Sequence, residues 1–300
     1  MNTDRSQRWR ERRDSYRPAG ELFDPSKFGV ELIPGDSEAR AFIERHHYSG
    51  SYPNAVHRMG LYHRRSSFFA PELCGVAVFG VGSNEATVPK YAPGLHAREG
   101  LELSRLCLRD ETGDGTIIAG NAETWMLARA FNLLMQAERA KRRDNPERRP
   151  LRMVLAYSDP VPRRNVDGYL VMPGHIGQIY QAFSGRFVGR ASKRVEWLAR
   201  DGTIISERAL SKIRADEDPV RGVGHRYSYQ QLLRVGCPTR KPGESGVDYV
   251  ARVKASGLLT PVKHPGNLVY VWPMTNTGKS ALLPPMPFPT LSEYGLPVNP

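Results

Sequence analysis

Two residues near the middle of the chain are the first candidates for chemistry. Asp159 follows the apolar stretch 153–157, which is typical of a strand, and Tyr180 lies in a helix predicted after the stretch 174–177. A carboxylate at a strand end can take up a proton and a phenol can donate one, as general acid–base chemistry requires. The alternatives are a turn aspartate before Pro160 and a core tyrosine.

Polar side chains also occur within a strand predicted over residues 101–108. Side chains alternate along a strand, so Ser104 is expected on one face with Glu102, and Arg105 on the other face with Leu103 and Cys107. Each face therefore mixes polar and apolar groups, which indicates that part of this strand lines a cleft. A surface ion pair is the alternative explanation for Glu102 or Arg105.

The helix predicted from Ser37 ends in two further candidates, His47 and Tyr48. Either side chain pointing into a cleft would serve a site, whereas a histidine at a helix C-terminus is also favoured by the helix dipole alone. The adjacent His46 and His47 cannot share one helix face, so this pair does not predict a metal site.

Three glycines precede the long amphipathic helix that we predict to be capped by Asn121. They are Gly113, Gly115 and Gly120. The free backbone amides and the dipole at a helix N-terminus attract anions. These glycines and Asn121 are therefore the predicted cofactor-binding residues, with phosphate as the group they would hold. The loop lacks the GxGxxG and Walker patterns, so it does not by itself identify the ligand.

The charge balance is strongly basic, with 43 Lys and Arg against 31 Asp and Glu and a formal net charge of +12. Such a balance favours a polyanionic partner, nucleic acid first, although a merely solvated basic surface is the alternative. The arginine-rich segment 1–18 is expected to be a disordered arm that lies along phosphates, or a solvated tail. A turn behind the long helix supplies the other predicted DNA-binding residues, Arg139, Lys141, Arg142, Arg143, Arg148 and Arg149.

The three cysteines are Cys74, Cys107 and Cys237, far apart and without a CxxC pair. We therefore predict neither a metal site nor a disulfide framework. The first 13 residues are charged and contain no apolar core of a secretory signal, and no run approaches about 20 apolar residues. These features predict a cytoplasmic protein that does not bind membranes.

The order of strand and helix patterns divides the chain into four predicted regions. They are a basic flexible arm over 1–27, an α/β (α+β) domain over 28–215, an extension with helices and a last strand over 216–275, and a proline-rich tail over 276–300. Within the second region, Asp201-Gly202 between two apolar runs predicts a β-hairpin.

Five motifs, in this order along the chain, resemble the phage Mom family over roughly residues 40–215. They are His47-Tyr48-Ser49, Cys74-Gly75-Val76-Ala77-Val78-Phe79-Gly80, Glu102-Leu103-Ser104-Arg105-Leu106, Tyr157-Ser158-Asp159 and Gly174-His175-Ile176-Gly177-Gln178-Ile179-Tyr180-Gln181-Ala182. The order of elements is similar to the GNAT acyltransferase fold, a central mixed, mostly antiparallel sheet flanked by helices. That fold binds acyl-CoA through its pyrophosphate at the amides before the long central helix.

The resemblance implies a DNA-modifying transferase. Mom proteins are GNAT-like enzymes that convert adenine to N6-carbamoylmethyladenine and shield phage DNA from restriction. The implied catalytic residues are Asp159, Tyr180, Arg105, Tyr48, Ser104 and His47. Asp159 would orient the adenine amine or take its proton, Tyr180 would donate to a leaving group, and Tyr48 or Tyr52 would stack on a flipped base.

The resemblance also implies double-stranded DNA as partner, the host cytoplasm as location if the protein is phage-encoded, and acetyl-CoA or a related acyl-CoA as cofactor. The chain departs from the family pattern in an insertion over Pro162–Met172 and in a glycine loop that is not Arg/Gln-x-x-Gly-x-Gly/Ala. Two other functions stay open at this point. One is a GNAT-type N-acyltransferase acting on a protein or a small amine, and the other is a non-catalytic DNA-binding protein on the same scaffold.

Overall fold

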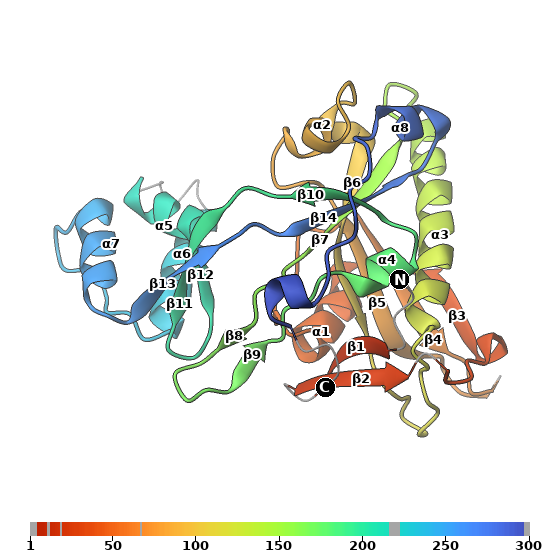
Figure 1. Ribbon diagram of the computed structural model, residues 1–300, viewed down its shortest axis with the longest axis horizontal. Helices are drawn as coiled ribbons and strands as arrows, with labels where there is room; N and C mark the ends of the chain where they lie inside the picture. Colours follow the sequence, from red (N-terminus) through yellow and green to blue (C-terminus); the bar gives the residue numbers. More distant parts are fainter. Residues whose placement is uncertain (1–4, 11–12, 19, 67, 216–222, 297–300) are drawn as a thin grey trace. The chain divides into compact units, whose positions relative to one another are not determined.

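The chain forms two compact units in the computed structural model, which describes all residues except 1–4, 11–12, 19, 67, 216–222 and 297–300. Unit 1 comprises Met1–Pro160, Gly174–Arg190 and Asn267–Pro300 (Figure 1). Unit 2 comprises Val161–Pro173 and Ala191–Gly266, two segments that interrupt the chain of unit 1. The units thus divide the chain differently from the four predicted regions.

A seven-stranded sheet forms the centre of unit 1, in the order β10-β14-β7-β6-β5-β4-β3. Its strands are β3 (Phe28–Leu32), β4 (His57–His63), β5 (Glu72–Gly80), β6 (Gly100–Leu108), β7 (Met153–Ser158), β10 (Arg186–Arg190) and β14 (Leu268–Pro273). All neighbouring pairs are antiparallel except β6 and β7, which pair in parallel. The predicted fold class, a mixed and mostly antiparallel sheet flanked by helices, is confirmed.

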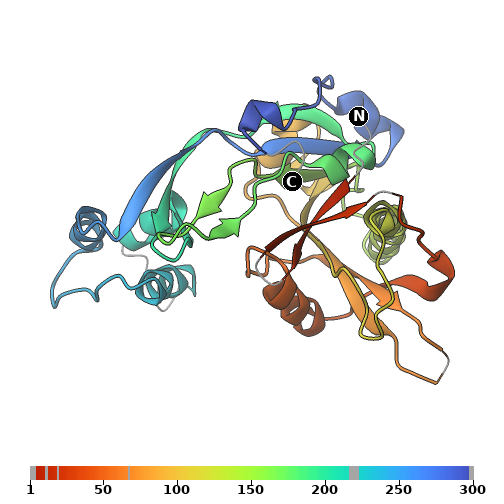
Figure 2. The ribbon, with the colours of Figure 1, turned by 60° about the horizontal axis from the view of Figure 1, so that its bottom comes forward.

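Helices cover both faces of this sheet. On one face, α3 (Ala122–Asp144) buries the predicted apolar stripe, including Leu127 and Leu134. On the other face, α1 (Asp36–His46) buries Phe42 and Ile43. Figure 2 shows strands of the sheet between these two helices. Burial of each such side chain contributes about 1.5–3 kcal/mol, so the two helices are held by their apolar stripes.

Strand β6 contains a bulge at Ser104. Val78 of β5 pairs with Arg105 and the next residue, Phe79, pairs with Leu103, so that Ser104 is an extra residue on β6. The bulge changes the alternation of side chains. Leu103 packs in the core against α3, whereas Cys107 packs in the core against α1. The prediction that Leu103, Arg105 and Cys107 share one face was therefore wrong.

The N-terminal arm is ordered where the structure describes it, in contrast to the predicted disordered arm. Strands β1 (Arg5–Arg10) and β2 (Arg13–Pro18) form an antiparallel hairpin. The predicted C-terminal tail contains α8 (Asn276–Ala281), and the amide of Met286 donates to Phe187 O of β10 at 2.8 Å. The remaining short helices of unit 1 are α2 (Thr87–Tyr91), α4 (Gln178–Ala182) and the 3-10 turns Pro25–Lys27, Ala97–Glu99 and Ser292–Tyr294.

Unit 2 has its own sheet, in the order β12-β11-β13, and its own core. Its elements are β8 (Arg163–Arg164), β9 (Leu170–Met172), β11 (Arg194–Ala199), β12 (Ile204–Ser206), α5 (Glu207–Arg214), α6 (Val223–Arg234), α7 (Gly246–Ala255) and β13 (Leu259–His264). The predicted hairpin at Asp201-Gly202 is confirmed, with φ +89° at Gly202, and Ser206 caps α5 through the amide of Ala209. Among all described residues, no helix combines the length and apolarity that crossing a bilayer requires.

Candidate active site

Six side chains from four segments of unit 1 interact beside the bulge of β6. We name this group the site cluster, and its members are Tyr48, Glu102, Arg105, Asp159, His175 and Tyr180. Tyr48 follows α1, Glu102 and Arg105 lie on β6, and Asp159 follows β7. His175 precedes α4, and Tyr180 lies within it. Four of the six predicted catalytic residues therefore belong to one cluster.

His175 links the strand end to the tyrosines. Its amide donates to Asp159 O at 2.8 Å, and its Nε2 lies 3.4 Å from the hydroxyl of Tyr48. Its ring centroid is 6.4 Å from that of Tyr180, in an edge-on arrangement. Burial lowers the pKa of His175 to about 4, against an opposing contribution from the Asp159 carboxylate. The imidazole is therefore neutral near pH 7 and can accept a proton from a neighbouring hydroxyl.

Arg105 is held in a fixed position by its hydrogen bonds. Its Nη2 donates to Ser51 Oγ at 3.0 Å, its Nε to Ser51 O at 3.2 Å, and its Nη1 to Ser104 O at 2.6 Å. Burial lowers the pKa of the Arg105 side chain, and the nearby Tyr48 and Glu102 act in the opposite direction. A guanidinium stays charged in proteins even so, and the site cluster therefore contains one immobile cation.

Glu102 provides an acid in the same cluster. Burial raises the pKa of its carboxyl, while Arg105 and a hydrogen bond from Ser104 partly offset this rise. Glu102 and Arg105 are three positions apart, a spacing that would put them on opposite faces of a regular strand. The extra residue of the bulge brings them to one side, so that the cation and the acid both influence Tyr180.

The ring of Tyr180 is anchored in the core while its hydroxyl belongs to the cluster. The side chain is only 6% exposed, and its ring lies 5.5 Å from Tyr270 and 5.7 Å from Trp272 between centroids. Burial raises the pKa of the Tyr180 hydroxyl, and the charges that reach it come from Tyr48, Glu102 and Arg105. A core tyrosine and a functional tyrosine were alternatives in the sequence; the structure places the ring in the core and the hydroxyl near Tyr48, Glu102 and Arg105.

Gly177 allows this packing. It precedes α4 with φ +77°, a conformation that favours glycine. A Cβ atom at this position would lie 2.6 Å from the ring of Tyr270 and 2.9 Å from the ring of Tyr180. It would also lie 3.1 Å from Ser158 Oγ, a fully buried atom without a hydrogen-bond partner among the described residues. A side chain at 177 would thus displace the candidate proton donor.

The remaining predicted catalytic residues lie at the edge of the cluster. His47 stacks on Tyr48 with 4.1 Å between centroids, and its Nδ1 accepts the amide hydrogen of Ser49. Burial, and then the charge of Arg105, lowers the pKa of His47. Ser104 Oγ donates to Glu102 O at 3.3 Å and so reinforces the bulge. Both side chains thus contact members of the site cluster.

Tyr52 is engaged elsewhere on the surface. Its hydroxyl donates to Asp36 at 3.0 Å and Arg40 lies over its ring at 4.6 Å. Of the two tyrosines predicted to stack on a base, only Tyr48 lies in the site cluster.

In the predicted phosphate loop, the amide of Gly113 is already bonded to an acceptor and is not available to a phosphate. The amide of Gly113 donates to both carboxylate oxygens of Glu72 at 2.9 Å, and Pro18 O lies 2.9 Å from where a Cβ of Gly120 would be. Asn121 is at the N-cap position of α3, as predicted, but its side chain makes no capping hydrogen bond. Gly115, with φ +81°, shapes the turn without a ligand role that the contacts define.

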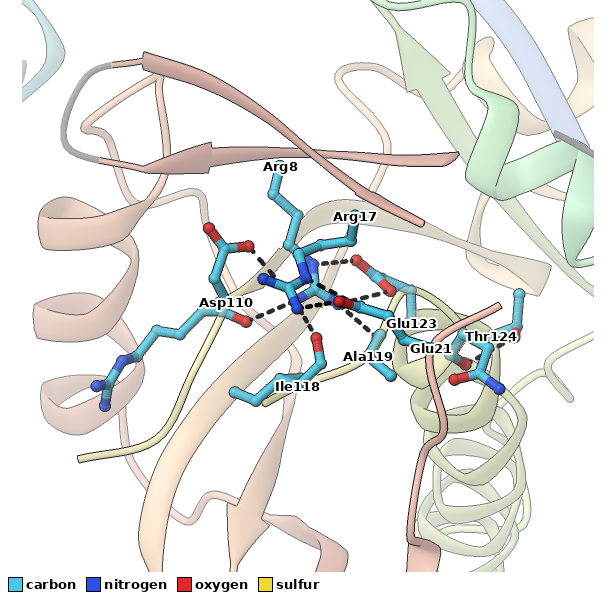
Figure 3. Close-up of polar contacts among 10 residues, drawn as sticks. Arg8, Arg17, Glu21, Asp110, Ile118, Ala119, Glu123 and Thr124 are labelled. Atoms are coloured by element: carbon cyan, nitrogen blue, oxygen red, sulfur yellow. Dashed lines mark hydrogen bonds and ion pairs between the residues drawn. The ribbon is translucent and has the colours of Figure 1, made fainter. Parts of the chain in front are cut away.

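A buried arginine from the N-terminal hairpin lies at the first turn of α3 (Figure 3). Arg8 donates to Glu123 at 2.7 and 3.0 Å, and to the carbonyl oxygens of Arg109, Ile118 and Ala119 at 2.8, 2.5 and 2.8 Å. Carbonyl and carboxylate oxygens therefore converge where a pyrophosphate was expected. These residues fit a cation, and they do not fit the pyrophosphate of acyl-CoA.

The six predicted DNA-binding residues differ in their surroundings. Buried Glu138 accepts hydrogen bonds from Arg148 at 3.0–3.2 Å and lies 3.7 Å from Lys141, which also contacts His57. The other four predicted DNA-binding residues are exposed and form no ion pair within the described part of the chain; they are Arg139, Arg142, Arg143 and Arg149. Two of the six cations, Lys141 and Arg148, are thus held by Glu138, and the other four face solvent.

Three contributors to the site were not predicted as site residues: Ser51, Glu102 and His175. His175 lies inside the glycine-rich motif before Tyr180, and that motif was the signal that could have identified it. Ser51 and Glu102 could not be assigned without knowing the bulge. Among the described residues there is no group of three His, Cys, Asp or Glu side chains that could hold a metal ion.

The match to a family model agrees with this placement of motifs. A comparison with curated proteins gave no match. The model described as Mom protein family matches residues 27–235, which include every member of the site cluster and most of unit 2. Because this match spans more than half of the chain, the protein belongs to the Mom protein family.

Proposed function

We propose that this protein is a transferase that converts adenine in DNA to an N6-substituted, carbamoylmethyl-type adenine and so protects phage DNA from restriction. The family is associated with DNA modification, which supports DNA as substrate. The observation that carries the proposal is the convergence of Tyr48, Asp159 and Tyr180 around the neutral imidazole of His175, with Arg105 close to the two tyrosines.

The chemistry of adenine explains why such a cluster is needed. The lone pair of the exocyclic amine is delocalised into the ring, so the amine is a poor nucleophile. When N6 forms a bond to the carbon of the added group, one N–H proton must leave and the donor's leaving group must depart. A base near N6, an acid near the leaving group and a fixed positive charge lower the barriers to these events.

The geometry suggests a role for each side chain. Asp159 orients the amine or takes its proton, beside His175. Tyr180 stays protonated near neutral pH because burial raises the pKa of its hydroxyl, and it can protonate the leaving group. Arg105, fixed by Ser51, stabilises negative charge that develops on the donor. Tyr48 offers a ring on which a flipped base can stack.

The donor of the added group is a separate proposal. Acetyl-CoA or a related acyl-CoA is implied by the GNAT resemblance, but the oxygen atoms around Arg8 would repel a pyrophosphate at the start of α3. The proposed roles of the site cluster do not depend on that position. Either a different donor is used or the anionic part of the donor is bound by other residues.

Mass spectrometry of nucleosides tests the proposal. DNA from cells that express the protein is expected to contain an N6-substituted deoxyadenosine, and Tyr180→Phe and Asp159→Asn are expected to abolish it while DNA binding persists. Tyr52→Phe is the matched control, because Tyr52 bonds to Asp36 outside the site cluster. Only unmodified nucleosides with the wild-type protein would reject the proposal and leave a DNA-binding protein or an acyltransferase with another acceptor.

A further inference from the structure

The insertion that separates Asp159 from His175 forms a hairpin with an exposed apolar tip. Strands β8 and β9 pair, and the turn between them presents Val166 at 69% and Tyr169 at 71% exposure. Single exposed apolar residues are common on protein surfaces. An aliphatic and an aromatic side chain that flank one tight turn are a different case, because together they form an apolar edge at the end of a projecting element.

The turn itself is rigid. The side-chain oxygen of Asn165 accepts the amide hydrogens of Asp167 at 3.1 Å and Tyr169 at 2.9 Å, and the amide of Asn165 donates to Tyr169 O at 3.0 Å. Arg164 Nη1 donates to Gly168 O at 2.8 Å, where Gly168 has φ +82°. Five residues are therefore fixed by four hydrogen bonds, and the exposed side chains stand on a preorganised support.

The hairpin is also clamped to the sheet of unit 2. Buried Arg163 of β8 donates to buried Glu196 of β11 at 2.7 Å, and Arg194 donates to the other oxygen of Glu196 at 2.7 Å. The amide of Val166 donates to Arg200 O at 3.0 Å. Because these bonds already fix the turn, inserting its two apolar side chains between stacked groups would cost little conformational entropy.

The charge of unit 2 as a whole favours a polyanion. Unit 2 contains 16 Lys and Arg against 9 Asp and Glu. Arg164 beside the turn and Arg200 behind it are both exposed. The hairpin lies in the chain between Asp159 and His175, which are joined by a backbone hydrogen bond. The seven Cα–Cα steps from Asp159 to Val166 can span at most about 24 Å, or roughly seven base-pair steps.

We propose that the β8–β9 hairpin is a wedge that enters duplex DNA at its tip, with Val166 and Tyr169 filling the space of the adenine that leaves the base stack. This inference rests on the proposed function, because it names how the site obtains its substrate from a duplex. Apolar wedges that separate base steps, and bases flipped into sites, are established ways of handling DNA. Arg164 of the hairpin and Arg200 of the neighbouring turn would contact the flanking phosphates.

Paired and unpaired adenine distinguish a wedge from a structural element. The double variant Val166→Ser with Tyr169→Ala is expected to modify a fully paired duplex about tenfold or more slowly than wild type, because unstacking must then occur unaided. The same variant is expected to stay within about twofold of wild type on the same adenine in an unpaired bubble. Tyr169→Phe keeps the stacking ring and should match wild type on both substrates. Phe68→Ala removes an exposed aromatic residue of unit 1 and is the control.

A duplex that carries 2-aminopurine at the target position reports unstacking without any group transfer. Its fluorescence is expected to rise with wild-type protein and to rise much less with the double variant. This rise in the absence of modified nucleoside would retain the wedge and reject the proposed function. Equal modification of the paired duplex by wild type and double variant, or an equal loss on paired and unpaired adenine, would overturn the wedge.

Discussion

The buried ion pair between Arg8 and Glu123 makes a strong prediction about stability. The side chains of Arg8 and Glu123 are 3% and 8% exposed, and Arg8 reaches five oxygen atoms of Glu123 and the loop before α3. Arg8→Met removes the guanidinium from Glu123, from Asp110 and from the carbonyl groups of the loop, of which Ala119 O keeps the amide of Ala122 as a donor. Removing one partner of a buried pair costs about 3–5 kcal/mol, because the other charge stays buried without compensation.

The N-terminal hairpin sets an upper limit to this loss. When Arg8 is absent, the hairpin can separate from α3 and admit water to Glu123, so the cost cannot exceed the free energy that docks the hairpin. We therefore expect the lower part of the range, about 3 kcal/mol. Glu123→Leu combined with Arg8→Met removes the buried carboxylate as well and should recover part of the loss, because Asp110, 3.5 Å from Arg8, and the carbonyl groups still lack the guanidinium.

Urea unfolding, followed by hydrogen exchange at the amides of β1 and β2, measures both effects. Arg17→Ala is the matched control on the same hairpin, because Arg17 pairs with Glu21 in a half-exposed position where about 0–1 kcal/mol is expected. A cost for Arg8→Met no larger than that for Arg17→Ala would refute the reasoning. So would a double variant with Glu123→Leu that is less stable than either single variant, because the coupling would then have the wrong sign.

Four further predictions concern the site and the basic turn. Arg105→Lys keeps the charge but not the fork that binds Ser51, and it should slow adenine modification about tenfold or more with unchanged DNA binding. The pKa of His175 is lowered from 6.5 to about 4 in the folded protein, so the unfolded chain binds more protons between these pH values. Up to about 3 kcal/mol of folding stability is therefore lost as the pH falls from 6.5 to 4. Urea titrations should show a weaker dependence of stability on pH for His175→Asn than for wild type. Gly177→Ala should lower the modification rate more than it lowers DNA affinity. Arg142→Gln and Arg143→Gln should each reduce the slope of log affinity against log salt by about 1, and unchanged slopes would exclude them as phosphate contacts.

Elements with a local pattern were predictable from the sequence. The apolar stripe that includes Leu127 and Leu134 identified α3, because the period of a helix is written in neighbouring residues. Asp201-Gly202 identified a hairpin, and Ser206 identified the start of α5, since turn and cap chemistry is also local. The mixed, mostly antiparallel central sheet was implied by the resemblance of the element order to a known fold.

Features that depend on pairing between distant segments were not predictable. Arg8 is about 110 residues from the loop that buries it, and nothing in its charged neighbourhood distinguishes it from a solvated arginine. Glu138 likewise forms ion pairs with Lys141 and Arg148, which the sequence does not distinguish from the other basic residues around them. In both cases a buried acid selects its partner through the fold, and sequence spacing does not record that choice.

The bulge at Ser104 is the same kind of feature, and the site depends on it. In a regular strand Arg105 would follow Leu101 and Leu103 into the apolar core beneath α3, where an unpaired guanidinium is costly. The extra residue turns Arg105 to the opposite face, where Ser51 and Ser104 accept its hydrogens. Gly80 of β5 permits the close approach on which this pairing relies, because a Cβ there would collide with Asn54 O and lie 3.2 Å from Ser104 Oγ. The position of the cation therefore results from the register between two strands, and a change at Gly80 should disturb the site without touching any residue that does chemistry.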